Sequence, residues 1–204
     1  MIRVIDRLNC NRHPDIIDQI FKLRRRVFVE ELGWTQFDVD GVYERDQYDD
    51  DHAIHLASLN FKGQVVGYCR LYPTTLPHML SEVFSNFVAG RVPQRSDILE
   101  LTRAAVEPNY RGKKIWEEVF IGAHEFCQMH GVGAMTSFIR TLRVPYFQAA
   151  GMKLTPLGLP GDCNGEQLSA VSLEVSEEVI ESMRRRSGID QSVLESNTEH
   201  RKIA

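Results

Sequence analysis

The sequence contains few cysteines and no long hydrophobic run, and these absences exclude several classes of protein. Its four cysteines are far apart and form no CxxC pair: Cys10, Cys69, Cys127 and Cys163. Scattered thiols indicate a reduced, cytoplasmic protein, and His52 and His55 have no nearby cysteine to complete a zinc site. No segment is long enough to cross a membrane, and no secretion leader is recognisable. We therefore expect neither a metal site nor a membrane partner.

The sequence also lacks a strong excess of either charge. The net charge is -4 and 25% of the residues are charged, which gives no global reason to expect a nucleic-acid partner. With 204 residues, 43% of them hydrophobic, the chain can bury the core of one complete domain. We expect a single domain over residues 1–188, followed by a polar and frayed tail over residues 189–204.

Hydrophobic periodicity and turn residues predict that helices and strands alternate along the chain. The predicted helices cover residues 14–31, 79–88, 111–130, 142–150 and 177–186. The predicted strands cover residues 53–60, 64–72, 98–106, 134–139 and 167–175. Residues 35–52 are rich in Asp and lack periodicity, so we expect a long loop there. This order predicts a three-layer α/β sandwich around a mixed central sheet.

The most informative segment is a predicted strand, turn and helix between Ile98 and Ile115. The strand carries a carboxylate, Glu100, and a guanidinium, Arg103. The turn holds three basic residues and a glycine where the helix is expected to begin: Arg111, Gly112, Lys113 and Lys114. Helix N-termini present unpaired N–H groups that bind phosphates. A proton acceptor beside such a turn indicates an enzyme with a phosphate-bearing carrier; the alternative for the turn is a solvated, basic helix start.

Two further groups of residues have a structural and a functional interpretation. Carboxylates gather around Tyr48: Glu44, Asp46, Asp49, Asp50 and Asp51. They are either a solvated charge run or a pocket that attracts a cation or clamps arginines by paired hydrogen bonds. Arg24 and Phe28 share a helix face, and Trp34 follows at the helix exit. Phe28 is favoured as a core anchor; the alternative is an aromatic wall with a nearby guanidinium for a ligand.

These motifs, taken together, resemble the acyl-homoserine-lactone synthases, the autoinducer synthase family. The motifs in chain order are Arg24, Phe28 and Trp34, then Glu44-x-Asp46-x-Tyr48-Asp49, then Gly67-x-x-Arg70-Leu-x-Pro-Thr-Thr-x-Pro, then Phe84, then Glu100-x-Thr-Arg103. The turn Val106-x-Pro-x-Tyr-Arg-Gly-x-Lys-Ile resembles the acyl-CoA-binding turn of the wider N-acyltransferase superfamily. The second glycine usual in that turn is Lys114 here. The resemblance therefore implies an N-acyltransferase-like fold.

The resemblance also implies a reaction and a set of residue roles. The amine of S-adenosylmethionine would be acylated by an acyl thioester and would then lactonise with release of methylthioadenosine, for quorum sensing and without a tightly bound cofactor. Glu100 would be the catalytic base. The implied charged cluster is Asp46, Asp49, Arg70 and Arg103. The implied substrate-binding residues are Arg24, Phe28, Trp34, Phe84 and, near the acyl chain, Thr136 and Ser137. Arg111, Gly112, Lys113 and Lys114 would bind the phosphates of the donor.

Three points stay open at the level of the sequence. On an ideal strand Glu100 and Arg103 point to opposite faces, so either they act separately or a bulge brings them together, as the resemblance implies. The donor is acyl-CoA or an acidic acyl carrier protein, which would dock on a basic face. Candidates for that face are Arg140, Arg143 and Lys153, or the basic turn. The alternative functions are a general acyl-CoA-dependent N-acyltransferase and a non-catalytic ligand-binding relative.

Overall fold

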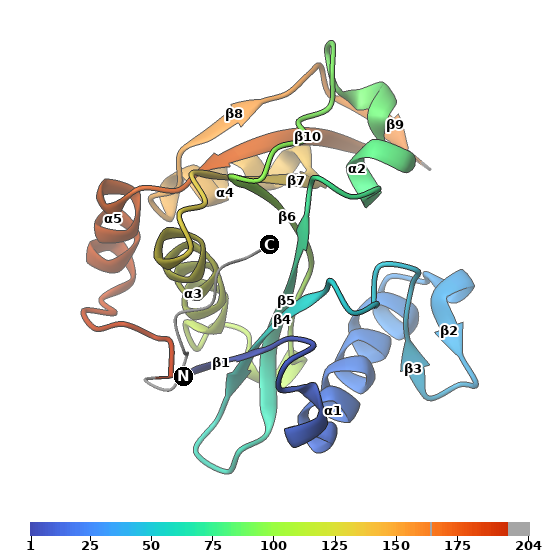
Figure 1. Ribbon diagram of the computed structural model, residues 1–204, viewed down its shortest axis with the longest axis vertical. Coiled ribbons are helices and arrows are strands. Elements are labelled where there is room, and N and C mark those ends of the chain that lie inside the picture. Colours follow the sequence, from blue (N-terminus) through green and yellow to red (C-terminus); the bar gives the residue numbers. More distant parts are fainter. Residues whose placement is uncertain (164, 196–204) are drawn as a thin grey trace. The chain divides into compact units, whose positions relative to one another are not determined.

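The computed structural model describes residues 1–163 and 165–195, which form helices and a mixed β-sheet (labelled in Figure 1). The strands of this sheet are β1 (Ile2–Ile5), β4 (Ile54–Leu59), β5 (Val65–Pro73), β6 (Ile98–Val106), β7 (Ala134–Arg140), β8 (Leu154–Pro156), β9 (Gly161–Cys163) and β10 (Glu166–Glu174). Their order is β1–β4–β5–β6–β7–β10–β8, with β9 also paired to β10. β6 and β7 are parallel, whereas β4 and β5 and the pairs made by β10 are antiparallel. The predicted mixed α/β fold is confirmed.

The remaining elements are helices and one small hairpin. The helices are α1 (Pro14–Arg24), its π-helical continuation Arg25–Glu31, α2 (Met79–Glu82), α3 (Ile115–Met129), α4 (Val144–Ala149) and α5 (Glu177–Ser187). The hairpin pairs β2 (Asp38–Val39) with β3 (Tyr43–Glu44). It lies in the segment that we expected to be a loop. Ser176 caps α5 by accepting a hydrogen bond from Val179 N, as its sequence predicts.

The described chain divides into two compact units. The first unit comprises Met1–Leu71, Arg103–Ala123 and residues 193–195, and the second comprises Tyr72–Thr102 and His124–Ser192. The division falls inside β6, so Arg103 belongs to the first unit and Glu100 to the second.

Helices cover both faces of the sheet in the first unit. A methyl group at Gly67 of β5 would lie 2.5 Å from a side-chain carbon of Ile115 and 2.9 Å from one of Val119, both on α3. The next residue, Tyr68, packs instead among buried residues of α1 such as Ile20 and Leu23. Successive strand residues point to opposite faces, so α1 and the start of α3 lie on opposite sides of β5. Glycine at position 67 permits the close approach of α3.

Several boundaries differ from the predictions for physical reasons. α3 begins at Ile115 rather than at residue 111, because Lys114 has a left-handed backbone with φ of 61°. The short strands β1, β8 and β9 were missed, since three or four residues carry little periodicity. The prediction of a frayed tail is wrong for residues 193–195: Leu194 is buried and bridges to Ile2, and Val193 is buried. The remainder of the predicted tail, residues 196–204, lies outside the described residues.

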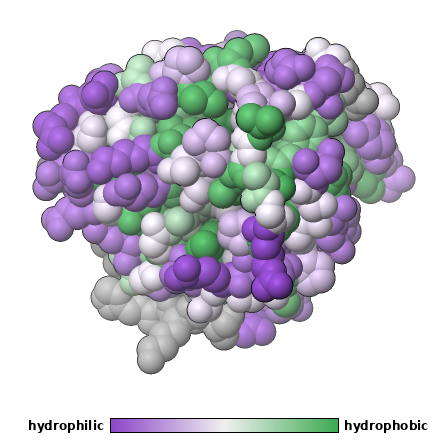
Figure 2. All heavy atoms as spheres, turned by 90° about the horizontal axis from the view of Figure 1, so that it is seen from above, coloured by the Kyte–Doolittle hydropathy of each residue, from purple (hydrophilic) through white to green (hydrophobic). Residues whose placement is uncertain are grey.

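Large hydrophobic side chains remain exposed at scattered positions of the described chain. In the second unit these include Leu142, Tyr146 and Leu159. Figure 2 shows one face of the molecule, on which hydrophobic residues alternate with groups of hydrophilic ones. Among the residues described, no helix combines the length and the hydropathy that crossing a bilayer requires.

Candidate active site

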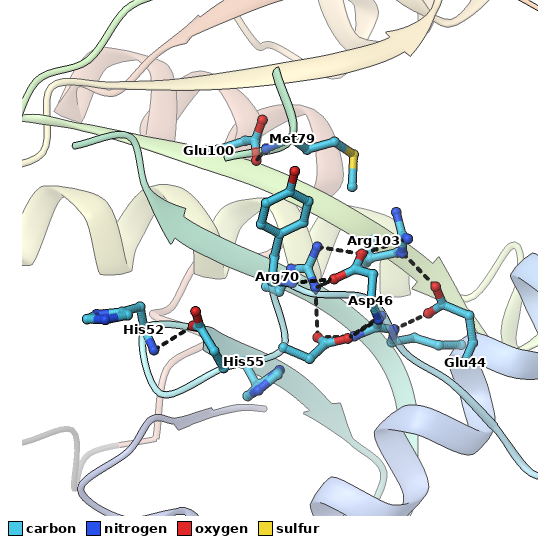
Figure 3. Close-up of polar contacts among 12 residues, drawn as sticks. Glu44, Asp46, His52, His55, Arg70, Met79, Glu100 and Arg103 are labelled. Carbon is cyan, nitrogen blue, oxygen red and sulfur yellow. Dashed lines mark hydrogen bonds and ion pairs between the residues drawn. The ribbon is translucent and has the colours of Figure 1, made fainter. Parts of the chain in front are cut away.

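Three arginines and three carboxylates of the first unit form a closed ring of ion pairs. We call these six residues the ionic ring: Arg24, Glu44, Asp46, Asp49, Arg70 and Arg103. Each carboxylate bridges two arginines: Glu44 joins Arg24 to Arg103, Asp46 joins Arg103 to Arg70, and Asp49 joins Arg70 to Arg24. Figure 3 shows the side chains of Glu44, Asp46, Arg70 and Arg103 directed toward one another. Equal numbers of opposite charges alternate, so the ring is neutral when all six groups are charged.

The geometry of the ring is that of strong, charge-assisted hydrogen bonds. Arg24 Nη1 and Nη2 lie 2.6 and 2.8 Å from the two oxygens of Asp49, and Arg70 Nη1 and Nη2 lie 2.6 and 3.0 Å from those of Asp46. Both pairs are bidentate, a geometry that only the planar guanidinium provides. Arg103 donates through Nε to Glu44 at 2.9 Å, and its Nη2 lies 2.7 Å from Asp46. The arginine clamp that we considered for the acidic loop is confirmed for its first three carboxylates.

Burial makes this network costly to break. Arg24, Glu44 and Arg70 are fully buried, and the Asp46 and Asp49 side chains are 1% and 2% exposed. Burial alone would raise the pKa of Asp49, but Arg24 and Arg70 outweigh it and hold the pKa of that carboxyl well below its usual range. The pKa of Asp46 is also lowered, because the hydrogen bond from Arg70 and the charges of Arg70 and Arg103 outweigh its burial. Asp46 and Asp49 are therefore fixed charges rather than proton acceptors.

A buried histidine lies beside the ring. His55 on β4 has Nδ1 2.7 Å from the hydroxyl of Tyr68 on β5. Burial lowers the pKa of His55 to about 4, with Arg24 and Arg70 acting in the same direction and Asp49 opposing them. Burial also raises the pKa of Tyr68. Both groups are consequently neutral near pH 7, and sequence reasoning did not identify this pair.

Three aromatic rings surround the guanidinium of Arg103. Phe28 and Trp34 are stacked with ring centroids 5.1 Å apart, and the Arg103 guanidinium lies 5.5 and 5.4 Å from them and 4.8 Å from Phe37. Phe28 is also buried in the core, as expected. The guanidinium beside the aromatic wall is thus Arg103, whereas Arg24 lies near Phe21 and Tyr68. Phe37 was missed, because the sequence showed no periodicity there.

Arg103 has an unusual backbone conformation for the interior of a strand. Its φ is 52°, in the left-handed region that non-glycine residues rarely occupy. A left-handed residue opens the bulge type in which one extra residue interrupts the pleat of a strand. The bulge that the resemblance implies for β6 stays a prediction, and the φ of Arg103 is consistent with it.

In the second unit, a buried carboxylate is held by backbone amides. Glu100 is 2% exposed and accepts hydrogen bonds from Met79 N at 3.1 Å and from Leu80 N at 2.6 Å. Figure 3 shows its side chain beside Met79. Backbone N–H groups orient a carboxylate without adding a full positive charge next to it. The amide hydrogen bonds of Glu100 thus differ from the guanidinium contacts of Asp46 and Asp49.

The turn that supplies these amides is itself tightly tied, and sequence reasoning overlooked it. His78 is fully buried; its Nδ1 lies 2.8 Å from Leu76 O and so carries the proton. Ser81 Oγ accepts from His78 N at 3.0 Å and donates to His78 O at 2.9 Å. These bonds fix the backbone on the N-terminal side of Met79 and Leu80. The Pro-Thr-Thr-x-Pro motif and the helix predicted over residues 79–88 were the signals that marked this segment in the sequence.

The two neighbouring hydroxyls proposed for acyl recognition have different surroundings. Thr136 is the register partner of Glu100 between β6 and β7, and it is fully buried. Its hydroxyl has no hydrogen-bond partner among the described residues. Ser137 Oγ instead donates to Leu101 O at 2.9 Å, so its hydroxyl is engaged by the sheet. Phe84 stacks on Phe138 at 4.0 Å, which places it in an aromatic cluster of this unit.

The basic turn of the first unit keeps its cations near the surface. The side chain of Arg111 is 43% exposed and pairs with Glu31 at 2.6 Å, and the ammonium of Lys113 lies 4.6 Å from the ring centre of Tyr110. Gly112 and Lys114 both have positive φ, of 80° and 61°. Glu118 N donates to Lys114 O at 3.0 Å, so the amides of the three residues before Glu118 precede the first helical hydrogen bond of α3. The structure thus retains an N–H-rich helix start.

Comparison with known protein families identifies the family of this chain. The model of the autoinducer synthase family matches residues 8–183, most of the chain. The chain belongs to the autoinducer synthase family. This autoinducer synthase is 33% identical over 190 residues to the isovaleryl-homoserine lactone synthase of Bradyrhizobium diazoefficiens. The aligned residues cover 93% of this chain and 86% of that protein. It is 31% identical over 181 residues to an acyl-homoserine-lactone synthase of Pseudomonas fluorescens, which spans 87% and 89% of the two chains.

Solved structures agree with the family. The autoinducer synthase matches a CoA-dependent acyl-homoserine lactone synthase, BjaI, solved with SAM and isopentyl-CoA, at a TM-score of 0.90 and 32% identity over 96% of this chain and 92% of that one. A second CoA-dependent acyl-homoserine lactone synthase, MesI, also gives a TM-score of 0.90, at 28% identity over 96% of this chain and 100% of that chain. An N-acetyltransferase from Lactobacillus plantarum shares the fold at a TM-score of 0.59 and 17% identity, over 86% of this chain and 99% of that chain. This autoinducer synthase is an acyltransferase with the N-acyltransferase fold.

Glu44 is the ring member whose place the sequence did not reveal. It was noted as one acidic residue among five, and the charged cluster implied by the resemblance omitted it. Arg24 was expected near the substrate, yet its guanidinium is fully buried and bonded to Glu44 and Asp49. The pair of Arg24 and Glu44 connects the helix α1 to the acidic segment. Both residues therefore shape the site from inside the fold.

Proposed function

We propose that this protein is an acyl-homoserine-lactone synthase that transfers an acyl group from acyl-CoA to S-adenosylmethionine and releases a quorum-sensing lactone. The observation that carries the proposal is the buried carboxylate of Glu100, held by the amides of Met79 and Leu80 in a member of the autoinducer synthase family. Relatives at 33% and 32% identity are an isovaleryl-homoserine lactone synthase and a CoA-dependent enzyme solved with SAM and isopentyl-CoA.

The first chemical step is acyl transfer. The ammonium of S-adenosylmethionine loses a proton to Glu100, directly or through a water, and the free amine attacks the thioester carbonyl. The carbonyl oxygen becomes an oxyanion that backbone N–H groups of β6 stabilise, each contributing roughly 3 kcal/mol. Collapse of the intermediate forms the amide and expels the CoA thiolate, which takes up a proton. Hydrogen bonds from the amides of Met79 and Leu80 orient Glu100 for this task.

The second step closes the lactone. The carboxylate of the acylated methionyl group attacks its own γ-carbon and breaks the bond to the sulfonium sulfur, so neutral methylthioadenosine leaves. The sulfonium loses its positive charge as it departs, so the leaving group needs no acid. The reacting groups are tethered in one molecule, and the site has only to hold a folded conformer. No tightly bound cofactor or metal takes part in this scheme.

The ionic ring and its aromatic neighbours shape the site for S-adenosylmethionine in this proposal. The arginines of the ring are already balanced by Glu44, Asp46 and Asp49, so they add no net charge for a substrate carboxylate to neutralise. The partly buried ring of Trp34 supplies an aromatic face, with Phe28 behind it. A cationic sulfonium is attracted to such a face. We assign Phe28 and Trp34 to substrate binding and the ring to the support of that wall.

The charges of the chain favour CoA over an acidic carrier protein as the donor. Arg140 is paired with Glu166, and Lys153 with Glu174 and Glu178, so two of the three cations considered for carrier docking outside the basic turn are already partnered. Lys113, Lys114 and the helix start of α3 remain for the phosphates of CoA, with Gly112 permitting the turn. Thr136 and Phe84 are assigned to the acyl chain, because the Thr136 hydroxyl is buried without a partner in the described structure. We place the reaction in the cytoplasm, where both substrates are made.

One assay with purified protein tests this proposal. S-adenosylmethionine is supplied with a series of straight and branched acyl-CoA thioesters, or with the same acyl groups on carrier protein. CoA thiol, methylthioadenosine and the lactone are then quantified by mass spectrometry. We expect the three products in equal amounts from at least one acyl-CoA, with a larger kcat/KM than from the matching carrier protein. CoA release without methylthioadenosine would indicate a general N-acyltransferase, and ligand binding without any product would indicate a sensor.

A further inference from the structure

We infer that Arg103 is a positioning residue: its side chain, closed into the ionic ring, holds a left-handed backbone conformation in the middle of β6. The ring would then act on acyl transfer through the backbone of β6, and not through contact with S-adenosylmethionine. This inference rests on the proposed function, because it concerns the strand whose N–H groups are assigned to the oxyanion.

The first observation is where the strained residue lies. Within the described residues, Asp40, Arg103 and Lys114 are the non-glycine residues with positive φ. Asp40 lies in the turn between β2 and β3 and Lys114 in the turn before α3, where such angles are common. Arg103 lies inside the nine-residue strand β6, where φ is ordinarily near -120°. For a residue with a side chain, the left-handed conformation is disfavoured by roughly tenfold or more.

The second observation is how strongly the side chain of this residue is held. Its guanidinium donates a hydrogen bond to Glu44 at 2.9 Å and forms an ion pair with Asp46 at 2.7 Å, and the centres of three aromatic rings lie within 5.5 Å of it. The side chain is 4% exposed. A strained backbone persists only where its surroundings over-determine it. The ring supplies this constraint from two separate carboxylates, and Ala105, two residues later, is anchored in the hydrophobic core.

The third observation concerns stability. A buried network of ion pairs is often no more stabilising than hydrophobic residues of the same volume. Six buried charged side chains are therefore weakly explained by folding stability alone. A requirement for one defined backbone geometry in β6 explains why three arginines and three carboxylates close into a ring that includes Arg103.

A glycine and alanine pair at position 103 separates the backbone from the side chain. Both substitutions remove the guanidinium, but glycine adopts positive φ freely and alanine does not. Removal of Arg103 alone leaves an excess buried carboxylate, so each substitution is combined with Asp46→Asn. The chain Glu44–Arg24–Asp49–Arg70 that remains is charge-balanced, and the asparagine oxygen can still accept from Tyr48 N. The variants compared are R103G/D46N and R103A/D46N.

We expect the glycine variant to retain a kcat for methylthioadenosine release at least tenfold above that of the alanine variant. Rates are normalised to the folded fraction, and the KM for S-adenosylmethionine should differ less than twofold between the two. A side chain that merely stabilised the fold would leave the two normalised kcat values equal, and that equality would overturn the inference. A main effect on the KM for S-adenosylmethionine, similar in both variants, would overturn it as well, since it would assign Arg103 to substrate binding.

A second measurement, without turnover, tests the backbone strain at position 103 directly. The folding equilibrium constant from urea denaturation should be about tenfold larger for R103G/D46N than for R103A/D46N, because only alanine is strained in the left-handed conformation. Equal constants would contradict the inference. If either variant does not fold, the single substitutions Arg103→Lys and Glu44→Gln, which keep most of the side-chain volume, are compared for kcat. A higher KM for S-adenosylmethionine with an unchanged kcat would then contradict the inference. Failure of the proposed function is distinct, because the unmodified enzyme itself would then release no methylthioadenosine.

Discussion

The carboxylates of the ionic ring and the carboxylate of Glu100 are equally buried, but they are stabilised by different partners. Asp46 and Asp49 bond to guanidinium groups, which hold their pKa values below the usual range. Glu100 accepts hydrogen bonds from the amides of Met79 and Leu80. A guanidinium offers a carboxylate a full positive charge, whereas a backbone amide offers only a partial one. Burial alone therefore does not separate a structural carboxylate from a candidate base; the chemistry of its partners does.

The largest effect should come from Glu100→Gln. Glutamine keeps the volume and one oxygen that can accept from Leu80 N, but it cannot take a proton. We expect kcat to fall by roughly 10²–10⁴-fold. The free energy of unfolding should decrease by roughly 1–3 kcal/mol, because the amide NH2 cannot accept from Met79 N. Methylthioadenosine release and urea denaturation measure the two quantities. A variant that is correctly folded and fully active would eliminate Glu100 as the base.

Breaking the ionic ring should act first on stability. Arg70→Met removes the partner of both Asp46 and Asp49, leaving two buried carboxylates short of positive charge. We expect the free energy of unfolding to decrease by roughly 3–5 kcal/mol, as for other buried pairs that lose one member. Arg143→Met, at an exposed position of the second unit, is the matched control and should change it by less than about 0.5 kcal/mol. Equal losses in both variants would contradict the importance of the ring.

The buried histidine beside the ring should give stability a dependence on pH. The folded-state pKa of His55 is lowered to about 4, below its value of about 6.5 in the unfolded chain, so folding favours the neutral ring. This stabilisation is present above pH 6.5 and is lost as the pH falls toward 4, by roughly 3 kcal/mol in total. Protonation of Asp46 and Asp49 removes further stability at lower pH. His55→Gln should flatten the upper part of the profile in urea denaturation from pH 7 to 4.5; an unchanged slope would show that other groups cause it.

The two adjacent hydroxyls of β7 should respond in opposite ways. Thr136→Val removes a buried hydroxyl without a described partner and should raise the free energy of unfolding by up to about 1 kcal/mol. Ser137→Ala removes a donor to Leu101 O and should lower it by about 1 kcal/mol. Only the first change should alter the preference among acyl-CoA donors, measured as ratios of kcat/KM. A shift of preference in Ser137→Ala alone would reverse the assignment.

The smallest effect concerns the basic turn. Lys114 has a positive φ at the position where the superfamily turn usually has glycine, so Lys114→Gly should stabilise the fold by up to about 1 kcal/mol. The same change should raise the KM for acyl-CoA if the ammonium contributes to phosphate binding. Lys62→Gly, in the exposed hairpin turn, provides the comparison for loss of a lysine charge. An unchanged KM would indicate that the turn binds the phosphates through its backbone amides and not through the Lys114 ammonium.

Much of the fold was predictable from local sequence patterns. The strand from Ile98 to Val106 has the bounds that its sequence pattern predicts. Ser176 caps the last helix, as its residue type and position predict. The hairpin β2–β3 and the short strands β8 and β9 were not found, because two or three residues are stabilised by their partners rather than by their own pattern. The candidate site was found mainly through motif resemblance, which identified Glu100 and Arg103 but no geometry for either.

The sequence by itself determined the chemical inventory: which carboxylates, guanidinium groups and aromatic rings the chain carries, and a motif order sufficient to indicate its family. Only the tertiary structure decided how these groups are used. It closed Glu44 and Arg24 into the ring, set Phe37 beside Arg103, and gave Glu100 amide partners from a turn twenty residues earlier in the chain. The left-handed backbone at Arg103 was equally undetermined by its residue type. The physical reason is that a pKa, a strained angle or an ion pair depends on partners distant in sequence, which local propensity does not encode.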